Sequence, residues 1–295
     1  MKLVTSLNIR SEQVSEPRLI DALVRAGFDG IDLPFYQHRD SVDWNDERAL
    51  NEWADQRAQW TEDAGLPWLQ AHGPFFDMFG QDDEAKRQRE TCRHAIRVCG
   101  RLGIPWMVLH PDIFPGPCDA DHIRAIHQGN VEFFRSLIDD CEKHNVGIAI
   151  ENIFDHYAQT KGCPRYFAGR PDEQCALIDE LNHPLIGACW DTGHAHMNGI
   201  DQRQGITQLG ERLKAIHIQE TRAGEDRDDH VLPFSIEPPA VDWEGVTAGL
   251  RAIAFQGPFT FETHQALRRV PPELLDAALR YNVAIGRYLV SRITR

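Results

Sequence analysis

The chain has 295 residues, 42% hydrophobic and 26% charged, which is the balance of an ordinary globular protein. Its formal net charge of −14 argues against nucleic acid as a partner. The sequence contains no apolar run near the roughly 20 residues of a membrane span, no signal-peptide pattern, and seven scattered cysteines without a CxxC pair. We therefore expect a reduced, cytoplasmic protein without membrane contact.

Short apolar runs alternate with helical stretches along the whole chain. The runs are typical of strands buried on both faces, as in parallel sheets. We predict strands at 3–7, 30–33, 66–71, 106–110, 146–150, 186–190, 214–216 and 259–261. We predict helices at 17–26, 46–64, 83–102, 119–144, 171–181, 202–212, 243–254 and 272–293. The stretches 155–170 and 219–241 lack a period and are predicted to be long loops at the rim of a pocket.

This alternation predicts an α/β fold, a single (β/α)8 barrel over residues 1–295, with no low-complexity linker to divide it. A doubly wound open sheet is the alternative. Chemically capable residues end strands three to eight in turn, and an open sheet would spread them over its width. In a barrel all six converge at the C-terminal ends of the strands, where such folds carry their active sites.

The six residues at those strand ends are His72, His110, Glu151, Asp191, His217 and Glu262. Carboxylates and imidazoles without cysteine suit a divalent metal, with Mn²⁺ or Zn²⁺ favoured over Mg²⁺, Co²⁺ and Fe²⁺. Such a metal would polarise a carbonyl and the neighbouring hydroxyl and acidify the carbon between them.

Two more polar groups follow strands six and seven. His194 stands three residues after Asp191, and Asp228 and His230 follow His217. We expect these side chains to contact substrate or to hold a second or third metal. Arg222 is a further candidate for contact with substrate, although a solvated arginine explains it equally well.

The sequence also carries a resemblance. The motifs His72-Gly-Pro, Leu-His110-Pro, Glu151-Asn, Asp191-Thr-Gly-His194 and Phe-Glu262-Thr resemble the xylose isomerase-like TIM-barrel superfamily, in particular the sugar phosphate isomerase/epimerase group. Nearly the whole chain takes part. The resemblance implies one divalent metal, held by Glu151, Asp191, His217 and Glu262. It also implies that Glu151 and Glu262 form the acid–base pair and that His194 contacts substrate.

A more distant relative in this superfamily is endonuclease IV, a three-zinc DNA repair nuclease. Its nine metal-ligand positions are matched here by His72, His110, Glu151, Asp191, His194, His217, Asp228, His230 and Glu262. The same resemblance therefore allows a phosphodiester hydrolase with several zinc ions.

The leading hypothesis is a metal-dependent isomerase or epimerase of a sugar, keto-polyol or sugar phosphate. A dehydratase acting on a keto-polyol would use the same site, and an endonuclease IV-like hydrolase is the other alternative. The acidic net charge disfavours the nuclease. We expect a small carbohydrate partner with apolar walls from Phe75, Phe76, Tyr157 and Phe234, and the sequence leaves a homo-oligomer open.

Overall fold

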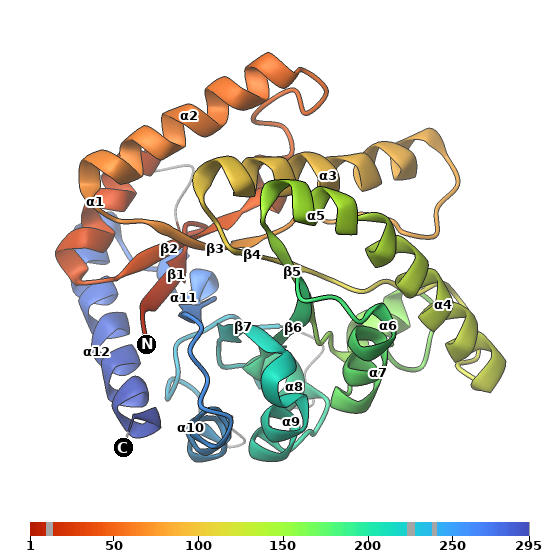
Figure 1. The fold of residues 1–295 in the computed structure, drawn as a ribbon. Helices are drawn as coiled ribbons and strands as arrows, with labels where there is room; N and C mark the ends of the chain where they lie inside the picture. The colour runs from red at the N-terminus through yellow and green to blue at the C-terminus, as the bar shows by residue number, and fades with distance from the viewer. Residues whose placement is uncertain (10–13, 223–227, 238–240, 295) are drawn as a thin grey trace.

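Eight parallel strands form a closed barrel in a computed structural model that describes residues 1–9, 14–222, 228–237 and 241–294. The strands are β1 (Leu3–Ser6), β2 (Gly30–Pro34), β3 (Trp68–His72), β4 (Trp106–Leu109), β5 (Gly147–Glu151), β6 (Ile186–Asp191), β7 (Leu213–Ile218) and β8 (Phe259–Phe261). Pairing of β1 with β8 closes the ring, with Leu3 opposite Phe259. The predicted (β/α)8 barrel is confirmed, and each predicted strand overlaps the observed one (Figure 1).

Long helices surround the barrel on its outside, and three short helices lie in the loops that follow β5, β6 and β8 (Figure 1). They are α1 (Glu16–Ala26), α2 (Glu47–Ala64), α3 (Asp83–Leu102), α4 (Ala120–Ser136), α5 (Ile138–His144), α6 (Asp155–Thr160), α7 (Pro171–Leu181), α8 (Thr192–Met197), α9 (Gln202–Leu209), α10 (Trp243–Ala252), α11 (His264–Arg268) and α12 (Leu275–Ile293). Short 3₁₀ turns lie at Phe35–His38, Gly210–Arg212 and Pro272–Leu274. Within the described ranges, no helix is both long and apolar enough to span a bilayer.

The prediction of one helix over 119–144 was wrong, because the chain breaks into α4 and α5 at Leu137. The hydroxyl of Ser136 donates to the carbonyl of Phe133 at 2.7 Å. The carbonyl of Ser136 accepts from Arg93 at 2.8 Å. A side chain that bonds to nearby backbone competes with the helical ladder, and a partner on α3 takes up the freed carbonyl.

The stretch 155–170 was predicted to be an irregular loop, but it contains α6. Its second half is also packed: Cys163, Tyr166, Phe167 and Ala168 are each at most 3% exposed. The hydroxyl of Tyr166 donates to the carbonyl of Pro111 at 2.9 Å. Only the first half of the stretch forms an exposed edge, where Tyr157 is 40% exposed.

The inside of the barrel beneath the strand ends is filled by small and polar side chains, among them Asp32 of β2, whose pKa burial raises to about 6. Val108, Ala149, Cys189 and Ala215 form a cluster from β4 to β7. On the other side, the hydroxyl of Thr260 donates to Gln70 at 3.2 Å. Large side chains pack instead between the strands and the helices. The barrel is thus a solid support, and its open space lies above the strand ends.

Asn152 joins the ends of β5 and β6, directly after Glu151. Its side-chain oxygen accepts from the N–H of Asp191 at 2.7 Å, and its side-chain nitrogen donates to the carbonyl of Asp191 at 3.0 Å. The residue is fully buried. This pair of bonds fixes the spacing of two candidate ligands, Glu151 and Asp191.

We predict that Asn152→Ala lowers the free energy of unfolding by about 2–4 kcal/mol, because two buried backbone groups lose their partners. Denaturant unfolding would measure the change, with Gln59→Ala on the exposed face of α2 as the control. A variant as stable as the parent would mean that the two strand ends hold their spacing without this side chain.

Candidate metal centre and surrounding pocket

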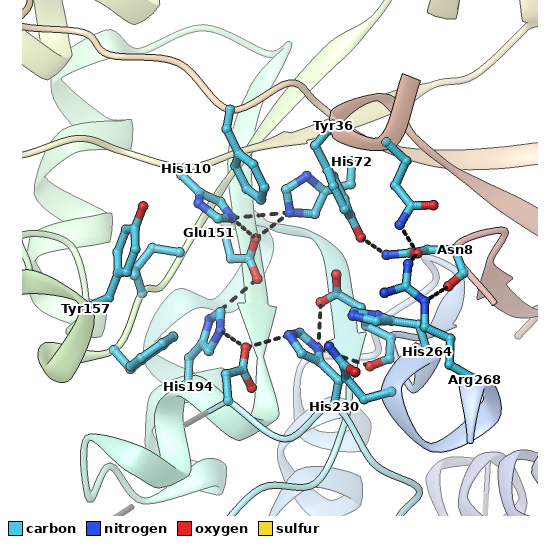
Figure 2. A pocket seen from close by; sticks show the side chains of 17 residues that line it. Asn8, Tyr36, His72, His110, Glu151, Tyr157, His194, His230, His264 and Arg268 are labelled. Atoms are coloured by element: carbon cyan, nitrogen blue, oxygen red, sulfur yellow. Dashed lines mark hydrogen bonds and ion pairs between the residues drawn. The ribbon is translucent and has the colours of Figure 1, made fainter. Parts of the chain in front are cut away.

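A cavity of about 440 Å³ opens at the C-terminal ends of the strands (Figure 2). This volume is within the range of small-molecule sites. Its walls come from nearly every strand end and from the loops that follow. They comprise Asn8, Tyr36, Gln37, His72, Phe75, His110, Glu151, Ile153, Phe154, Tyr157, His194, Asp228, His230, Glu262, His264, Gln265 and Arg268.

The four predicted ligands meet at the floor of this cavity. Glu151, Asp191, His217 and Glu262 each place a donor atom within 4.8 Å of the others. All four are at most 6% exposed. Nδ1 of His217 lies between the two glutamates, 3.0 Å from Oε1 of Glu151 and 3.3 Å from Oε2 of Glu262.

These residues fit a divalent cation. Three buried carboxylates in one small volume repel each other unless positive charge is present. Oε2 of Glu151 is buried and accepts no hydrogen bond in the described structure. It nevertheless faces Nε2 of His110 at 3.1 Å and Nε2 of His72 at 3.6 Å. Converging oxygen and nitrogen lone pairs are the ligands that Mn²⁺ and Zn²⁺ take.

The two glutamates have opposite pKa shifts. Burial raises the pKa of the Glu262 carboxyl to about 7, against the opposing effect of His217 and His230. Burial acts in the same direction on Glu151, but there the neighbouring His217 and His110 outweigh it and hold the pKa well below its usual value. Of the two, Glu262 is the carboxyl that accepts a proton near neutral pH.

Cys189 is close to this centre, which we did not expect from the sequence. Its Sγ lies within 4.8 Å of donor atoms of Glu151 and His217, from inside the barrel. Burial raises the pKa of this thiol to about 12, so it stays neutral. It therefore adds no thiolate to the carboxylate and imidazole set.

A second group lies on the side of β3 and β4. Nε2 of His72 and Nε2 of His110 are 3.2 Å apart, and both face Glu151. Burial, reinforced by the charge of His110, lowers the pKa of His72 to about 3. His72 is therefore a neutral imidazole.

A third group lies after β6 and β7. Asp228 sits between two imidazoles, with Oδ2 3.0 Å from Nε2 of His194 and 2.6 Å from Nε2 of His230. Gln219 donates to the other oxygen of Asp228 at 2.7 Å. Although burial disfavours the charged ring, Asp228 and Glu262 raise the pKa of His230 to about 9. In the absence of a cation this group is an imidazolium–carboxylate cluster.

Three of these histidines share one orientation (Figure 2). Nδ1 of His72, His194 and His230 faces a backbone carbonyl, that of Gly73 at 3.1 Å, Asn152 at 2.8 Å and Glu262 at 3.2 Å respectively. An Nδ1–H that donates to a carbonyl fixes the ring and directs Nε2 into the cavity. This is the arrangement in which imidazoles bind metals or polar substrates.

Of the four aromatic residues predicted to form the walls of the pocket, two line the cavity. Phe75 and Tyr157 line the cavity. Phe76 instead stacks on Phe133 with ring centroids 4.7 Å apart, and Phe234 packs near Trp243 at 6.0 Å. Part of the predicted rim loop 219–241, residues 223–227 and 238–240, lies outside the described residues.

Arg222 does not line the cavity as described. Its guanidinium lies 3.7 Å from Asp229, and nearly half of its side chain is exposed.

Sequence reasoning did not place Asn8 or Tyr36 in the pocket. Tyr36 stacks on Phe75 at 4.9 Å, and its hydroxyl accepts from Asn8 at 2.6 Å. Arg268, on α11, donates to the carbonyl of Asn8 at 3.2 Å. Only their position shortly after β1 and β2 distinguishes Asn8 and Tyr36 in the sequence, and Arg268 lies at the end of the short helix after β8.

Comparison with known proteins shows the family of this chain. A family model described as xylose isomerase-like TIM barrel matches residues 20–281. The chain belongs to this family. The relatives of this chain are named for different activities, including an epimerase and an endonuclease.

Two relatives illustrate that range. An L-ribulose 3-epimerase of Methylomonas sp. is 23% identical over 70% of this chain and 62% of its own length. A probable endonuclease 4 of Mycoplasma genitalium is 24% identical over 69% of this chain and 65% of its own. A closer match in identity, at 30%, is an uncharacterised protein of Sinorhizobium fredii, over 59% of this chain and 52% of that protein. The chain thus spans between half and two thirds of the length of these relatives.

Solved structures share the whole fold. A D-tagatose 3-epimerase-like protein superposes with a TM-score of 0.75, at 15% identity over 100% of this chain and 98% of that one. A protein named IOLI, solved with a zinc atom, has a TM-score of 0.71, at 18% identity over 100% of this chain and 98% of that one. At these levels of sequence identity, the structural similarity establishes the barrel fold and nothing further.

We predict that metal binding weakens as the pH falls through 7, because the cation must displace the proton held by Glu262. The apparent Kd for Mn²⁺ should rise by up to about tenfold between pH 7 and pH 6 for each proton displaced. Calorimetric titration in buffers of different ionisation enthalpy would count the protons released. Glu262→Gln should show a shallower dependence, and an affinity that is constant from pH 6 to pH 8 would contradict the assignment.

Proposed function

We propose that this protein is a divalent-metal-dependent isomerase or epimerase that acts on a sugar, keto-polyol or sugar phosphate by removing a proton next to a carbonyl. The observation that carries the proposal is the position of Glu151 and Glu262 on either side of His217, both lining a cavity that opens at the C-terminal ends of the strands. Glu151, Asp191, His217 and Glu262 would hold the metal. When bound, it would supply Lewis acidity toward the oxygens of the substrate.

The two glutamates suit opposite proton-transfer roles. A bound metal would keep both carboxylates ionised, so one is ready to accept a proton from carbon. The other can deliver a proton to the opposite face only after it has been protonated with substrate bound. Because Glu151 ends β5 and Glu262 follows β8, they approach the cavity floor from different sides. A base on one face and an acid on the other produce inversion at carbon, which is epimerisation.

The imidazoles around the floor suit a polyhydroxylated substrate. His72 is neutral and offers a lone pair to a hydroxyl, whereas His230 carries a proton that it can donate. Phe75 and Tyr157 supply apolar surface that keeps water from a reactive enediolate. The epimerase relative and the epimerase-like solved structure support the same substrate class.

A second candidate is phosphodiester hydrolysis with several metals. The observation in its favour is the orientation of His72, His194 and His230, whose Nε2 atoms point into the cavity next to Glu151 and Asp228. The endonuclease 4 relatives agree with it. Against it stand the net charge of −14 and the lining of the cavity, which among described residues has Arg268 as its one arginine or lysine. A dehydratase would use the same carboxylates and differs only in its product.

We predict one tightly bound metal per chain. Asp191→Asn should lose more than about 100-fold in metal affinity, because it removes a charged ligand and not only an outer partner. Asp228→Asn is the matched control, since it changes a carboxylate of the third group, and it should keep the metal. Elemental analysis and anomalous scattering would count the ions. Two or three ions, with one lost in Asp228→Asn, would favour the hydrolase.

We predict that Glu151→Gln and Glu262→Gln each lower kcat by about 10²–10⁴-fold, the usual contribution of a general acid or base. A panel of ketoses and their phosphates in D₂O, read by NMR, would detect exchange at the carbon next to the carbonyl. Each variant should lose turnover, and one that retains the base should still exchange deuterium from one face. Normal turnover in either variant would remove the two-carboxylate mechanism, and loss of water from the substrate would identify a dehydratase.

A further inference from the structure

Two cysteines outside the pocket lie side by side on separate segments. Cys118 belongs to the segment between β4 and α4, and Cys163 to the segment between α6 and α7. Their Sγ atoms and a ring nitrogen of His122 all lie within 4.8 Å of one another. Both thiols are free. This is the one place outside the central cavity where the described residues gather three such donor atoms.

The two thiols differ in access. Cys163 is 3% exposed, and its Sγ donates to the carbonyl of Phe114 at 3.0 Å. Cys118 is half-buried, and its Sγ lies 3.7 Å from the carbonyl of Arg165. A solute can therefore reach Cys118 more easily than Cys163. Burial also raises the pKa of the Cys163 thiol, so Cys163 is the less reactive of the two toward an oxidant from solution.

The hydrogen bonds of His122 argue against a metal at this place. Its Nδ1 accepts from the backbone N–H of Cys118 at 3.0 Å, so this nitrogen carries no proton. In the neutral ring the proton is then on Nε2, which donates to the carbonyl of Phe114 at 3.1 Å. A metal-bound histidine shows the opposite arrangement, with one N–H donating outward and the other nitrogen free to ligate. The two sulfur atoms therefore form a pair and not part of a cation site.

The two segments are already held together around this pair. The N–H of Gly116 donates to the carbonyl of Gly162 at 3.4 Å, and Tyr166 donates to Pro111 at 2.9 Å. Lys161 forms an ion pair with the buried Asp112. The two thiols are therefore adjacent in the folded state, without a large motion to bring them together.

We propose that Cys118 and Cys163 are an oxidation site, at which a small disulfide such as glutathione disulfide converts the two thiols into a reversible intramolecular disulfide. The thiolate of Cys118 attacks one sulfur of the oxidant and releases one thiol, leaving a mixed disulfide on the protein. Cys163 then loses its proton, attacks the sulfur of Cys118 and releases the second thiol. Two protein thiols are oxidised and one small disulfide is reduced to two thiols.

The disulfide would connect two segments that both reach the cavity. One begins directly after His110, and the other follows α6, which carries Tyr157 into the rim. Oxidation would thus fix the distance between these two parts of the wall. The proposal does not depend on the reaction that the pocket catalyses, and its tests need no substrate.

The experiment exposes the reduced, folded protein to glutathione disulfide and maps its peptides without reduction. We expect one cross-linked pair of peptides that contains Cys118 and Cys163, with a mass about 2 Da below the sum of the two thiol peptides. The midpoint of thermal unfolding should rise on the order of 5 °C, because the bond closes a long loop in the unfolded chain. Dithiothreitol should reverse both changes.

The matched control is Cys175→Ser, since Cys175 is also half-buried and lies away from the pair, on α7. It should keep the cross-link and the shift in unfolding temperature, and Cys118→Ser should lose both. Two results would overturn the proposal. One is a glutathione adduct that stays on Cys118 without transfer to Cys163. The other is a zinc ion bound to the reduced protein that is lost in both Cys118→Ser and His122→Ala.

Discussion

The constraint on which the site depends is the crowding of the carboxylates of Glu151, Asp191 and Glu262 in one small buried volume. At an effective dielectric constant near 20, two unit charges 4 Å apart interact by about 4 kcal/mol, so three carboxylates together are unfavourable without a counter-charge. When no cation is bound, the proton on His217, which lies between two of them, supplies part of that charge, and Glu262, with a pKa of about 7, takes up a further proton. A cation bound by these residues would replace both protons.

The barrel holds these carboxylates close together because the layer below them is tightly packed. Small side chains such as Val108 and Ala149 fill the interior, while Asn152 ties the ends of β5 and β6 by two hydrogen bonds. The charged groups therefore cannot move apart to relieve their repulsion. Because these groups are held in place by the fold, they need little rearrangement when a cation and a polar substrate bind.

The sequence predicted the parts of the fold that follow from local pattern. Strand ends at Glu151 and Glu262 are visible because an apolar run stops at a carboxylate, and closure of the ring then brings them together. The break at Leu137 was missed because it needs Arg93 from another helix to take the carbonyl of Ser136. Tyr36 and Asn8 were missed for a similar reason, since the hydrogen bond between them joins residues 28 positions apart.

The histidines show where sequence and structure carry different information. A sequence places His72, His194 and His230 near strand ends, but the function of an imidazole depends on which nitrogen holds the proton. In each of these three rings Nδ1 faces a backbone carbonyl, which keeps a proton on Nδ1. The same argument separates these rings from His122, whose Nδ1 accepts from a backbone N–H instead. The neutral ring of His72 thus directs an Nε2 lone pair into the cavity, and the charged rings of His194 and His230 direct an Nε2–H toward Asp228. The Nε2–H of His122 instead donates to a backbone carbonyl.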